Sequence, residues 1–375
     1  MFKNNASVFE EELISDVTKM MEDNPTLFKD EKVVLMADAH RGAGVPVGFT
    51  MTLTKGLVPI EFVGSDIGCG VTGYILKDLT LTPFQLKRLS LHMRDLVQVN
   101  RRLEYLGDTS TVTDFGTLGN SNHFVEIGTN GKDLLIAAHS GSRAKGGEFY
   151  KKTKALAIQN GKKRRDALVK EVLETIPPKQ RQEALKDIKI KMDSTPILHL
   201  EDYPDYLSDL GEVIDYASLN RLHILDSILT FLGQDLKVDL SHLTVVDSKH
   251  NYIDDWEDIP VLRKGAIKAN EGKRVIIPIN MRDGIIVGVA KDASDSNNSL
   301  PHGAGRVLGR KAAFEALDYE EFKEDMKNIL TPTMSHGILD ESPRAYKSID
   351  VILKDIEPYL SEYEVFKPLI NFKGE

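Results

Sequence analysis

Apolar residues recur at helical spacing in several long segments of the chain. The first segment spans about residues 8–23, and its apolar positions approximate one helical face. Thr82 is typical of a helix N-cap and Pro83 of the first helical turn, and the apolar face that follows predicts a helix to about residue 103. Further helical patterns cover most of residues 148–232 and three C-terminal segments, at about 304–317, 318–330 and 348–360.

Short aliphatic runs predict strands between these helices. A glycine-rich stretch over about residues 32–76 begins with one such run, Lys32 to Met36. Its many glycines, beside Asp and His, fit either a backbone folded tightly around a ligand or a plain layer of β-hairpins. Other strands are expected at about 122–128, 133–138, 243–247 and 274–290.

The mixture of elements predicts an α+β fold. The sequence contains no internal repeat, low-complexity tract or linker rich in Pro, Gly and Ser. We therefore expect a single domain over residues 1–375, with a mainly helical excursion at about 148–232.

The composition at first favours a cytosolic enzyme that acts on small molecules. The 375 residues include 48 Lys and Arg, 57 Asp and Glu and one Cys, for a net charge of −9. An acidic chain argues against a nonspecific polyanion binder, and a single Cys excludes an intrachain disulfide. The N-terminus lacks the apolar core of a signal peptide and no apolar run is long enough for a membrane span, so we expect a cytoplasmic protein without membrane contact.

The charge is distributed unevenly, which changes that first interpretation. The segment from Arg143 to Lys191 holds 15 Lys and Arg against 6 Asp and Glu, a net charge of +9, so the rest of the chain carries −18. The densest cluster is Lys162, Lys163, Arg164 and Arg165. It fits either a solvated helix face or a strip that attracts a phosphate backbone, such as that of RNA.

Five residues in short polar stretches could bind metal ions: Asp66, Cys69, His123, His139 and His250. Glycines beside the only cysteine free the backbone to turn, so Asp66 and Cys69 can point toward one place. The three histidines lie at the ends of predicted strands, where side chains leave the core. Each residue alone also fits an ordinary buried or surface position. Together, the nitrogen, oxygen and thiolate donors suit Mn²⁺, Fe²⁺ or Zn²⁺, and a thiolate can bridge two ions.

Another stretch, Pro301 to Arg306, leads into the helix expected at 304–317. Backbone N–H groups at a helix start, small residues and an arginine together could bind a phosphate. His302 could there attack phosphorus and form a phosphoramidate. A glycine-rich turn with an incidental histidine fits the same residues.

Taken in order, these stretches resemble the RtcB family of GTP-dependent RNA-splicing ligases. The resemblance spans about residues 30–374. The matching stretches are Asp38-Ala39-His40, Asp66-Ile67-Gly68-Cys69-Gly70, Gly116-Thr117-Leu118-Gly119, Asn122-His123-Phe124, His139-Ser140-Gly141-Ser142-Arg143, Ala217-Ser218-Leu219-Asn220-Arg221, His250-Asn251-Tyr252, Arg263-Lys264-Gly265-Ala266, His302-Gly303-Ala304-Gly305-Arg306, Ala345-Tyr346-Lys347 and Lys373-Gly374.

The resemblance implies an RtcB-like α+β fold, with β-sheets around a central dinuclear metal site and helices outside. It implies that RNA 2′,3′-cyclic phosphate or 3′-phosphate ends are joined to 5′-hydroxyl ends, using GTP and two Mn²⁺ ions. It leaves open which RNA is repaired, whether an activating protein partner is needed and the oligomeric state.

The resemblance also implies a role for each matching residue. Cys69 would bridge the two ions, with His139 and His250 completing one site and Asp66 and His123 the other. His302 would be the nucleophile that takes GMP, oriented by Asp38. The nucleotide-binding residues would be Asn122, Glu126, Gly303, Gly305, Arg306, Tyr346 and Lys373, with Glu126 accepting from the adjacent N–H donors of guanine.

The chain departs from the family pattern in three places. Pro278 to Gly284 replaces the usual Gly-Ser-Met-Gly loop, Leu300-Pro301 replaces a Cys-Ser pair, and Asn120-Ser121 stands where two glycines are common. The altered loop keeps two other interpretations open. One is a two-metal cyclic phosphodiesterase or hydrolase without productive GTP use, and the other is a non-catalytic RNA- or nucleotide-binding relative.

Overall fold

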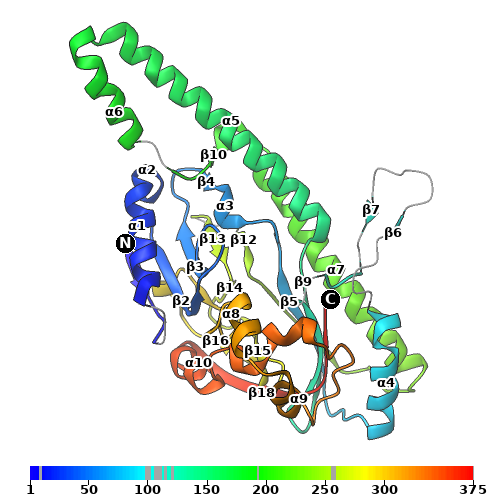
Figure 1. Ribbon diagram of the computed structural model, residues 1–375. Coiled ribbons are helices and arrows are strands. Elements are labelled where there is room, and N and C mark those ends of the chain that lie inside the picture. The colour runs from blue at the N-terminus through cyan, green and yellow to red at the C-terminus, as the bar shows by residue number, and fades with distance from the viewer. Residues whose placement is uncertain are drawn as a thin grey trace.

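A computed structural model describes residues 1–7, 11–97, 103–104, 112–113, 116–119, 122–191, 194–254 and 259–374. Its strands form two main sheets, with helices on their outer faces (Figure 1). The predicted α+β class is therefore confirmed. In the described part of the chain, no helix is both long and apolar enough to cross a membrane.

The larger sheet has seven strands, and each neighbouring pair runs antiparallel. The sheet is curled, and its two edge strands, β11 and β15, meet. The backbone N–H of Ile276 on β15 donates to Ser248 Oγ on β11 (3.1 Å). In order across the sheet, the strands are β11 (Leu243–Lys249), β5 (Gly70–Leu76), β9 (Leu134–Ser140), β8 (Phe124–Thr129), β18 (Leu360–Lys373), β16 (Gly284–Ala290) and β15 (Arg274–Asn280).

Both faces of this sheet are buried at its central strands β5, β9 and β8. Inside the curl, aliphatic residues form one core cluster with Phe124 and Phe366. Outside, α4 (Pro83–Leu96) and α7 (Tyr206–Gln234) pack their apolar faces on β5, β8 and β9. Burial on both faces explains why β9 is a continuous apolar run that ends in His139 and Ser140.

The smaller sheet has five strands and lies on the other side of the site. In order they are β1 (Phe2–Asn4), β2 (Val33–His40), β3 (Val47–Thr52), β13 (Val261–Lys264) and β12 (Asn251–Ile253), with only the β1–β2 pair parallel. A second large core cluster joins this sheet to α1 (Glu11–Asp23), α2 (Pro25–Phe28), α3 (Ile60–Val63) and the first half of α7.

The described residues also form three two-stranded ribbons and six short 3-10 helices. The ribbons pair β4 (Leu57–Pro59) with β10 (Ile197–His199), β14 (Ala266–Lys268) with β17 (Ser299–Pro301), and β6 (Leu103–Glu104) with β7 (Val112–Thr113). The 3-10 helices are η1 (Pro178–Gln180), η2 (Leu200–Asp202), η3 (Ser294–Ser296), η4 (His336–Glu341), η5 (Pro343–Ala345) and η6 (Glu357–Tyr359).

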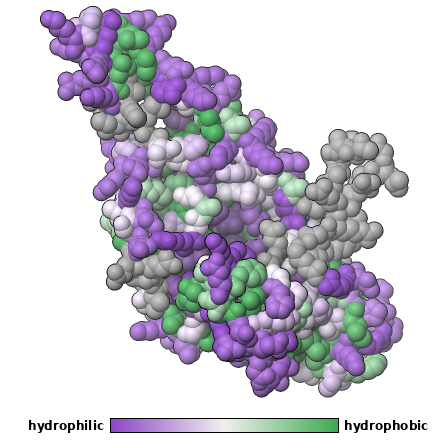
Figure 2. Space-filling model, viewed as in Figure 1, coloured by the Kyte–Doolittle hydropathy of each residue, from purple (hydrophilic) through white to green (hydrophobic). Residues whose placement is uncertain are grey.

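A helical arm projects from the body of the protein (Figure 1). It consists of the outer part of α5 (Arg143–Thr175) and of α6 (Arg181–Lys191). Hydrophilic side chains cover most of the arm, with an apolar patch near its tip (Figure 2). The arm and α7 account for the mainly helical pattern at 148–232.

Three predicted helices prove shorter than expected. Within the segments 304–317, 318–330 and 348–360, the α-helices extend only over α8 (Arg310–Ala316), α9 (Tyr319–Asp325) and α10 (Ile349–Ile356). The run at 274–290 is two strands joined by a tight turn, and β18 had no counterpart in the prediction. The first helix is described from Glu11, and residues 8–10 and 98–102 of two predicted helices lie outside the described residues.

Candidate metal and nucleotide site

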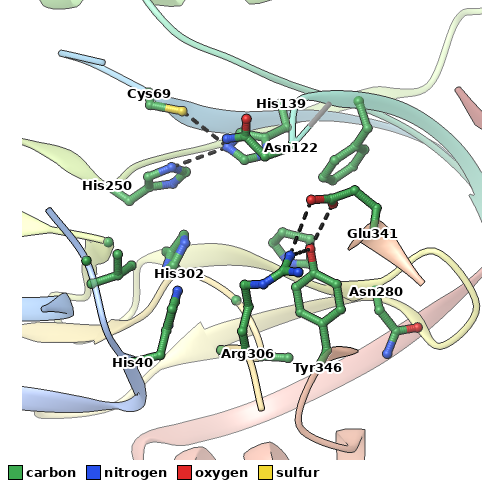
Figure 3. Close-up of a pocket in the computed structure, with 18 of the residues that line it drawn as sticks. His40, Cys69, Asn122, His139, His250, Asn280, His302, Arg306, Glu341 and Tyr346 are labelled. Carbon is green, nitrogen blue, oxygen red and sulfur yellow. Dashed lines mark hydrogen bonds and ion pairs between the residues drawn. The ribbon is translucent and has the colours of Figure 1, made fainter. Parts of the chain in front are cut away.

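A cavity of about 750 Å³ lies where the ends of strands from both sheets meet (Figure 3). Its walls include the ends of β2 and β18, the loop before β5, and the turn after β17. Asp66, Cys69, His139, His250 and His302 all line it. The predicted nucleotide residues line it too: Asn122, Glu126, Gly303, Gly305, Arg306, Tyr346 and Lys373.

The loop that carries Asp66 and Cys69 depends on two glycines. Gly68 has a φ of +69°, and a Cβ there would lie 2.9 Å from the backbone of Ile214 in α7. A Cβ on Gly141 would lie only 1.8 Å from the carboxylate of Asp66. Any larger residue at either place would displace the loop, so these glycines set where the donor atoms lie.

The five predicted metal ligands converge in two groups of three that share Cys69. One group is Cys69, His139 and His250, and the other is Asp66, Cys69 and His123; within each group the donor atoms lie within 4.8 Å of one another. Cys69 Sγ lies 3.2 Å from His139 Nε2 and 3.4 Å from His123 Nε2. A single thiolate could therefore contact two ions.

The protonation states of these donors suit cation binding. Burial lowers the pKa of His139 and His250 well below the ordinary value, so both rings are neutral with lone pairs available. Although desolvation opposes it, His123 holds the pKa of Asp66 below its usual range. Burial and the charge of Asp66 raise the pKa of the Cys69 thiol, and a divalent cation would favour its thiolate. The residues present thus fit a pair of divalent cations.

His302 is oriented by Asp38 beside this cluster. Its Nδ1 lies 2.6 Å from Asp38 Oδ2, which also accepts from the backbone N–H groups of His302 and Gly303 (3.1 Å each). Asp38 is fully buried, and the His302 ring centroid lies 4.6 Å from that of His250. An Nδ1–H donated to Asp38 leaves the lone pair of the ring on Nε2.

The expected helix N-terminus beside His302 is wrong. α8 begins only at Arg310, and the preceding residues form an irregular turn after β17. Gly305 has a φ of +73°, and a Cβ there would lie 2.3 Å from the carbonyl oxygen of Asp38. The turn therefore lies closely against β2 at a position that only glycine fits, and the start of α8 does not lie beside His302.

Three predicted nucleotide residues converge on a carboxylate that the sequence did not indicate, Glu341. Tyr346 donates to it (2.8 Å), Lys373 Nζ forms an ion pair with it (2.7 Å), and Arg306 lies 3.4 Å away (Figure 3). Burial opposes ionisation of Glu341, but Lys373 and two arginines lower its pKa to about 2. A charged Glu341 therefore holds all three side chains at the cavity wall.

Glu126 lies on strand β8 with a second unpredicted residue, Asn371 of β18, paired opposite it. Asn371 donates to Glu126 Oε2 (2.8 Å), while Oε1 has no partner among the described residues. Burial raises the pKa of Glu126 to about 8, although Asn371 and Lys373 oppose the shift. The cavity thus presents a buried carboxyl oxygen that can accept from a bound molecule.

Two further residues at the cavity, His40 and Lys264, had no predicted role. His40 donates from Nδ1 to the carbonyl of Asp38 (2.8 Å), and burial lowers its pKa to about 4. Desolvation also lowers the pKa of Lys264, which lies near Asp66 and Cys69. Both residues stand in motifs named above, but nothing in a single sequence distinguishes them from structural positions.

The departure at residues 278–284 forms the turn between β15 and β16. The Asn280 Oδ1 atom accepts from the backbone N–H groups of Arg282 and Asp283 (3.0 and 2.8 Å), so its side chain closes the turn. Ile279 and Met281 are almost fully buried. This loop therefore gives the cavity an apolar wall.

The basic cluster does not line the cavity and lies on α5. Arg164 is paired with Asp202 (2.7 Å) and Glu201, and Arg165 with Asp166 (2.9 Å). Lys162 and Lys163 are exposed. Of the cluster, these two lysines are the better placed to meet a partner.

Comparison with known proteins finds the same family by a family model and by individual relatives. The family described as "tRNA-splicing ligase RtcB" matches residues 24–109 and 98–374 of this chain. An "RNA-splicing ligase RtcB" from Escherichia coli K12 is 28% identical over 398 residues, which covers 93% of this chain and 91% of the relative. A "tRNA-splicing ligase RtcB" from Nanoarchaeum equitans is 24% identical over 411 residues, covering 86% and 83%.

Proposed function

Because the chain belongs to the RtcB family, we propose that this protein is an RNA ligase that acts through a histidine–GMP intermediate. It joins RNA 2′,3′-cyclic phosphate or 3′-phosphate ends to 5′-hydroxyl ends and uses GTP and Mn²⁺. The observation that carries the proposal is the convergence of two three-donor groups, shared through Cys69, beside the oriented ring of His302.

In this proposal, Cys69, His139 and His250 hold one ion, and Asp66, Cys69 and His123 hold the other. When bound, the ions withdraw negative charge from the reacting phosphate groups. The chain supplies fixed ligands, because the ends of rigid strands carry His123, His139 and His250. The His123 ring is also oriented by its own Nδ1, which donates to the carbonyl of Leu118 (2.7 Å).

His302 attacks the α-phosphorus of GTP through Nε2. The new bond joins nitrogen to phosphorus, the bond to the β-phosphate oxygen breaks, and pyrophosphate leaves. Asp38 holds the proton on Nδ1 and stabilises the positive ring that forms in the attack. At a 2′,3′-cyclic phosphate end, water first adds to phosphorus and the bond to the 2′-oxygen breaks, which leaves a 3′-phosphate. GMP then moves from His302 to the RNA 3′-phosphate, and the 5′-hydroxyl displaces GMP as the new phosphodiester forms.

Guanine is recognised by the free oxygen of Glu126. Its N1–H and N2–H groups are adjacent donors, which adenine does not present in that arrangement. Because a buried acceptor without a donor is unfavourable, guanine should be preferred over adenine. Arg306, Tyr346 and Lys373 form the neighbouring wall, and Asn122, Gly303 and Gly305 line the same cavity.

The arm would contact the RNA outside the cavity, through Lys162 and Lys163. Their charges lie on a projecting helix that begins at Arg143, directly after the His139 strand. An RNA end seated in the cavity could therefore extend along α5, where cations would bind its phosphates.

One observation favours a second candidate, a two-metal cyclic phosphodiesterase or hydrolase without productive GTP use. The β15–β16 turn uses Asn280 to satisfy its own backbone and presents Ile279 and Met281 to the cavity. This turn offers fewer polar groups to a nucleotide than the Gly-Ser-Met-Gly loop that the family usually has there.

Labelling with GTP separates the two candidates. Wild-type protein and His302→Ala would be incubated with α-labelled GTP and Mn²⁺, then analysed by denaturing electrophoresis. Label that stays on the wild-type protein but not on His302→Ala supports the ligase. Wild-type protein that binds metal and opens a 2′,3′-cyclic phosphate, yet takes no label, would support the hydrolase instead.

A further inference from the structure

Two adjacent residues in the middle of α7, Asn220 and Arg221, are fully buried at the metal-binding side of the cavity. Neither supplies a metal ligand. A buried arginine is costly unless nearly all its donors are satisfied, so the groups it contacts reveal what holds it there. Those groups lie on the segments that carry the proposed ligands.

The guanidinium of Arg221 joins three of these segments. Its Nη1 donates to the carbonyl of Gly68, next to Cys69 (2.8 Å), and to that of Ser140, next to His139 (3.0 Å). On its other side, Nη2 pairs with Asp247 of β11, the strand that leads to His250 (3.2 Å). Arg221 therefore contacts the segment of every member of the Cys69, His139 and His250 group.

Thr72 completes this arrangement. Its hydroxyl accepts from Arg221 Nε (2.8 Å) and donates to Asp247 (2.6 Å), so it fixes the orientation of the guanidinium plane. The segments are also bonded to one another, because the backbone N–H of His250 donates to the carbonyl of Cys69 (2.8 Å). A shift of Arg221 would thus move the ligands relative to one another.

Asn220 acts on the segment that orients His123. Its Nδ2 donates to the carbonyl of Thr117 (3.0 Å) and to Ser140 Oγ (3.0 Å), and its Oδ1 accepts from the backbone N–H of Thr117 (3.1 Å). Ser140 in turn donates to the carbonyl of Leu118, which also accepts from the His123 ring.

We propose that Arg221 and Asn220 are positioning residues that set the geometry of the two ion sites from outside them. Arg221 chiefly sets the group of Cys69, His139 and His250, and Asn220 sets the group that contains His123. The inference rests on the proposed two-metal site and adds the residues that determine its affinity. Metal–ligand distances in well-formed sites lie within about 0.2 Å of their standard values, and removal of a residue that orients a ligand typically lowers affinity about 10–100-fold.

Arg221→Lys tests the first half of the proposal. A lysine keeps the charge but cannot reach both carbonyls and the Asp247 carboxylate with a fork of fixed geometry. Titration with Co²⁺ reports the result, because a thiolate bound to Co²⁺ gives a charge-transfer band in the near ultraviolet. We expect a weaker Cys69 band at a given Co²⁺ concentration and an affinity about 10–100-fold lower, restored by excess metal.

Arg263→Lys is the matched control. Arg263 is nearly as buried and donates to Ser299, Asp254 and the carbonyl of Asn297, none of which is next to a proposed metal ligand in the sequence. It should lower the melting temperature without changing Co²⁺ affinity. A merely structural role for Arg221 predicts the same behaviour in both variants.

Two milder variants keep the test decisive if Arg221→Lys does not fold. Thr72→Val should weaken the same ion site to a smaller extent, and Asn220→Ala should weaken chiefly the ion held by the His123 group. Folded Arg221→Lys or Thr72→Val protein with wild-type Co²⁺ affinity and a wild-type band would overturn the inference. If wild-type protein itself bound no Co²⁺, the proposed two-metal function would fail first, and the inference would fail with it.

Discussion

The side of the cavity that we propose binds metal and the side that we propose binds the nucleotide are built in opposite ways. On the metal side, neutral histidines and a thiol crowd together, and Nε2 of His139 lies 3.2 Å from Cys69 Sγ and 3.3 Å from Nε2 of His250. On the nucleotide side, Arg306, Tyr346 and Lys373 already share the carboxylate of Glu341. The first side gains favourable interactions when cations arrive. On the second side, Glu341 holds these side chains in place before a nucleotide binds, which reduces the conformational entropy lost on binding.

The largest effect should come from removing the residue shared by both metal groups. Cys69→Ala should lose both ions, because each group then keeps only two donors, and ligation should fall by about 10⁴-fold or more, as when a catalytic unit is broken. Metal analysis of purified protein checks the first part, and a ligation assay with nicked RNA checks the second.

His123→Ala is the control for Cys69→Ala. It should keep the ion bound by Cys69, His139 and His250, so one ion per chain is expected. Equal metal content in Cys69→Ala and wild-type protein would contradict the bridging role of Cys69.

On the nucleotide side, Glu341→Gln should disturb structure and GTP binding but leave the metal content unchanged. The variant leaves the buried Lys373 amine without its carboxylate, which should cost about 3–5 kcal/mol of stability. Chemical denaturation measures the loss, and the KM for GTP should rise more than kcat falls. Loss of metal together with GTP binding would show that the two sides are not independent.

A smaller effect is expected in the pH dependence of GTP binding. Burial raises the pKa of Glu126 to about 8, so without a nucleotide this carboxyl group holds a proton at pH 7. Guanine donors bind the ionised form, so GTP affinity should rise about tenfold per pH unit up to about pH 8 and then level off.

Glu126→Gln removes this titration and serves as the matched variant. Its GTP affinity should be weaker and nearly independent of pH between 6 and 8. Calorimetry in buffers of different ionisation enthalpy would measure the proton released by wild-type protein on binding. No proton release and a flat wild-type profile would argue against Glu126 as the acceptor for guanine.

The smallest effect should lie on the arm. Reversing the charges of Lys162, Lys163, Arg164 and Arg165 should weaken RNA binding and its salt dependence, with a slope reduced by about one for each phosphate that the variant no longer neutralises. Transfer of GMP to His302 should be unchanged, because none of these residues lines the cavity. Lys327→Glu with Lys354→Glu is the charge-reversal control away from the arm, and equal RNA affinity in both variants would assign the basic cluster to a solvated helix face.

The metal side was predictable from the sequence because its residues are chemically unusual and lie in short motifs. His123 and His139 lie beside strand patterns that fix their places, and the lone Cys69 stands between glycines. The sequence did not predict that Glu341 binds Tyr346 and Lys373 or that Asn371 binds Glu126, because these contacts join segments that are distant in the sequence. Glu341 meets Lys373 only after β18 has paired with β8, and a carboxylate in an ordinary polar stretch carries no local signal.

The start of helix α8 and the strand β18 were not predicted, because contacts between distant segments determine both. The apolar spacing at 304–317 continues through Val307 and Leu308, but contact of Gly305 with the Asp38 backbone holds that turn in another conformation. The long strand β18 begins directly after the turn that ends the α10 region, and its residues from Glu362 to Glu364 are too polar for a strand pattern. Tertiary contacts override the local signal at both places.

Electron paramagnetic resonance of Mn²⁺-loaded protein tests the central claim most directly. Two ions bridged by one thiolate are magnetically coupled, so wild-type protein should bind two Mn²⁺ per chain and give the multiline signal of a coupled pair, and Cys69→Ala should lose that signal. A single bound Mn²⁺, or two ions with the separate six-line spectra of uncoupled centres, would contradict the two-metal site shared through Cys69.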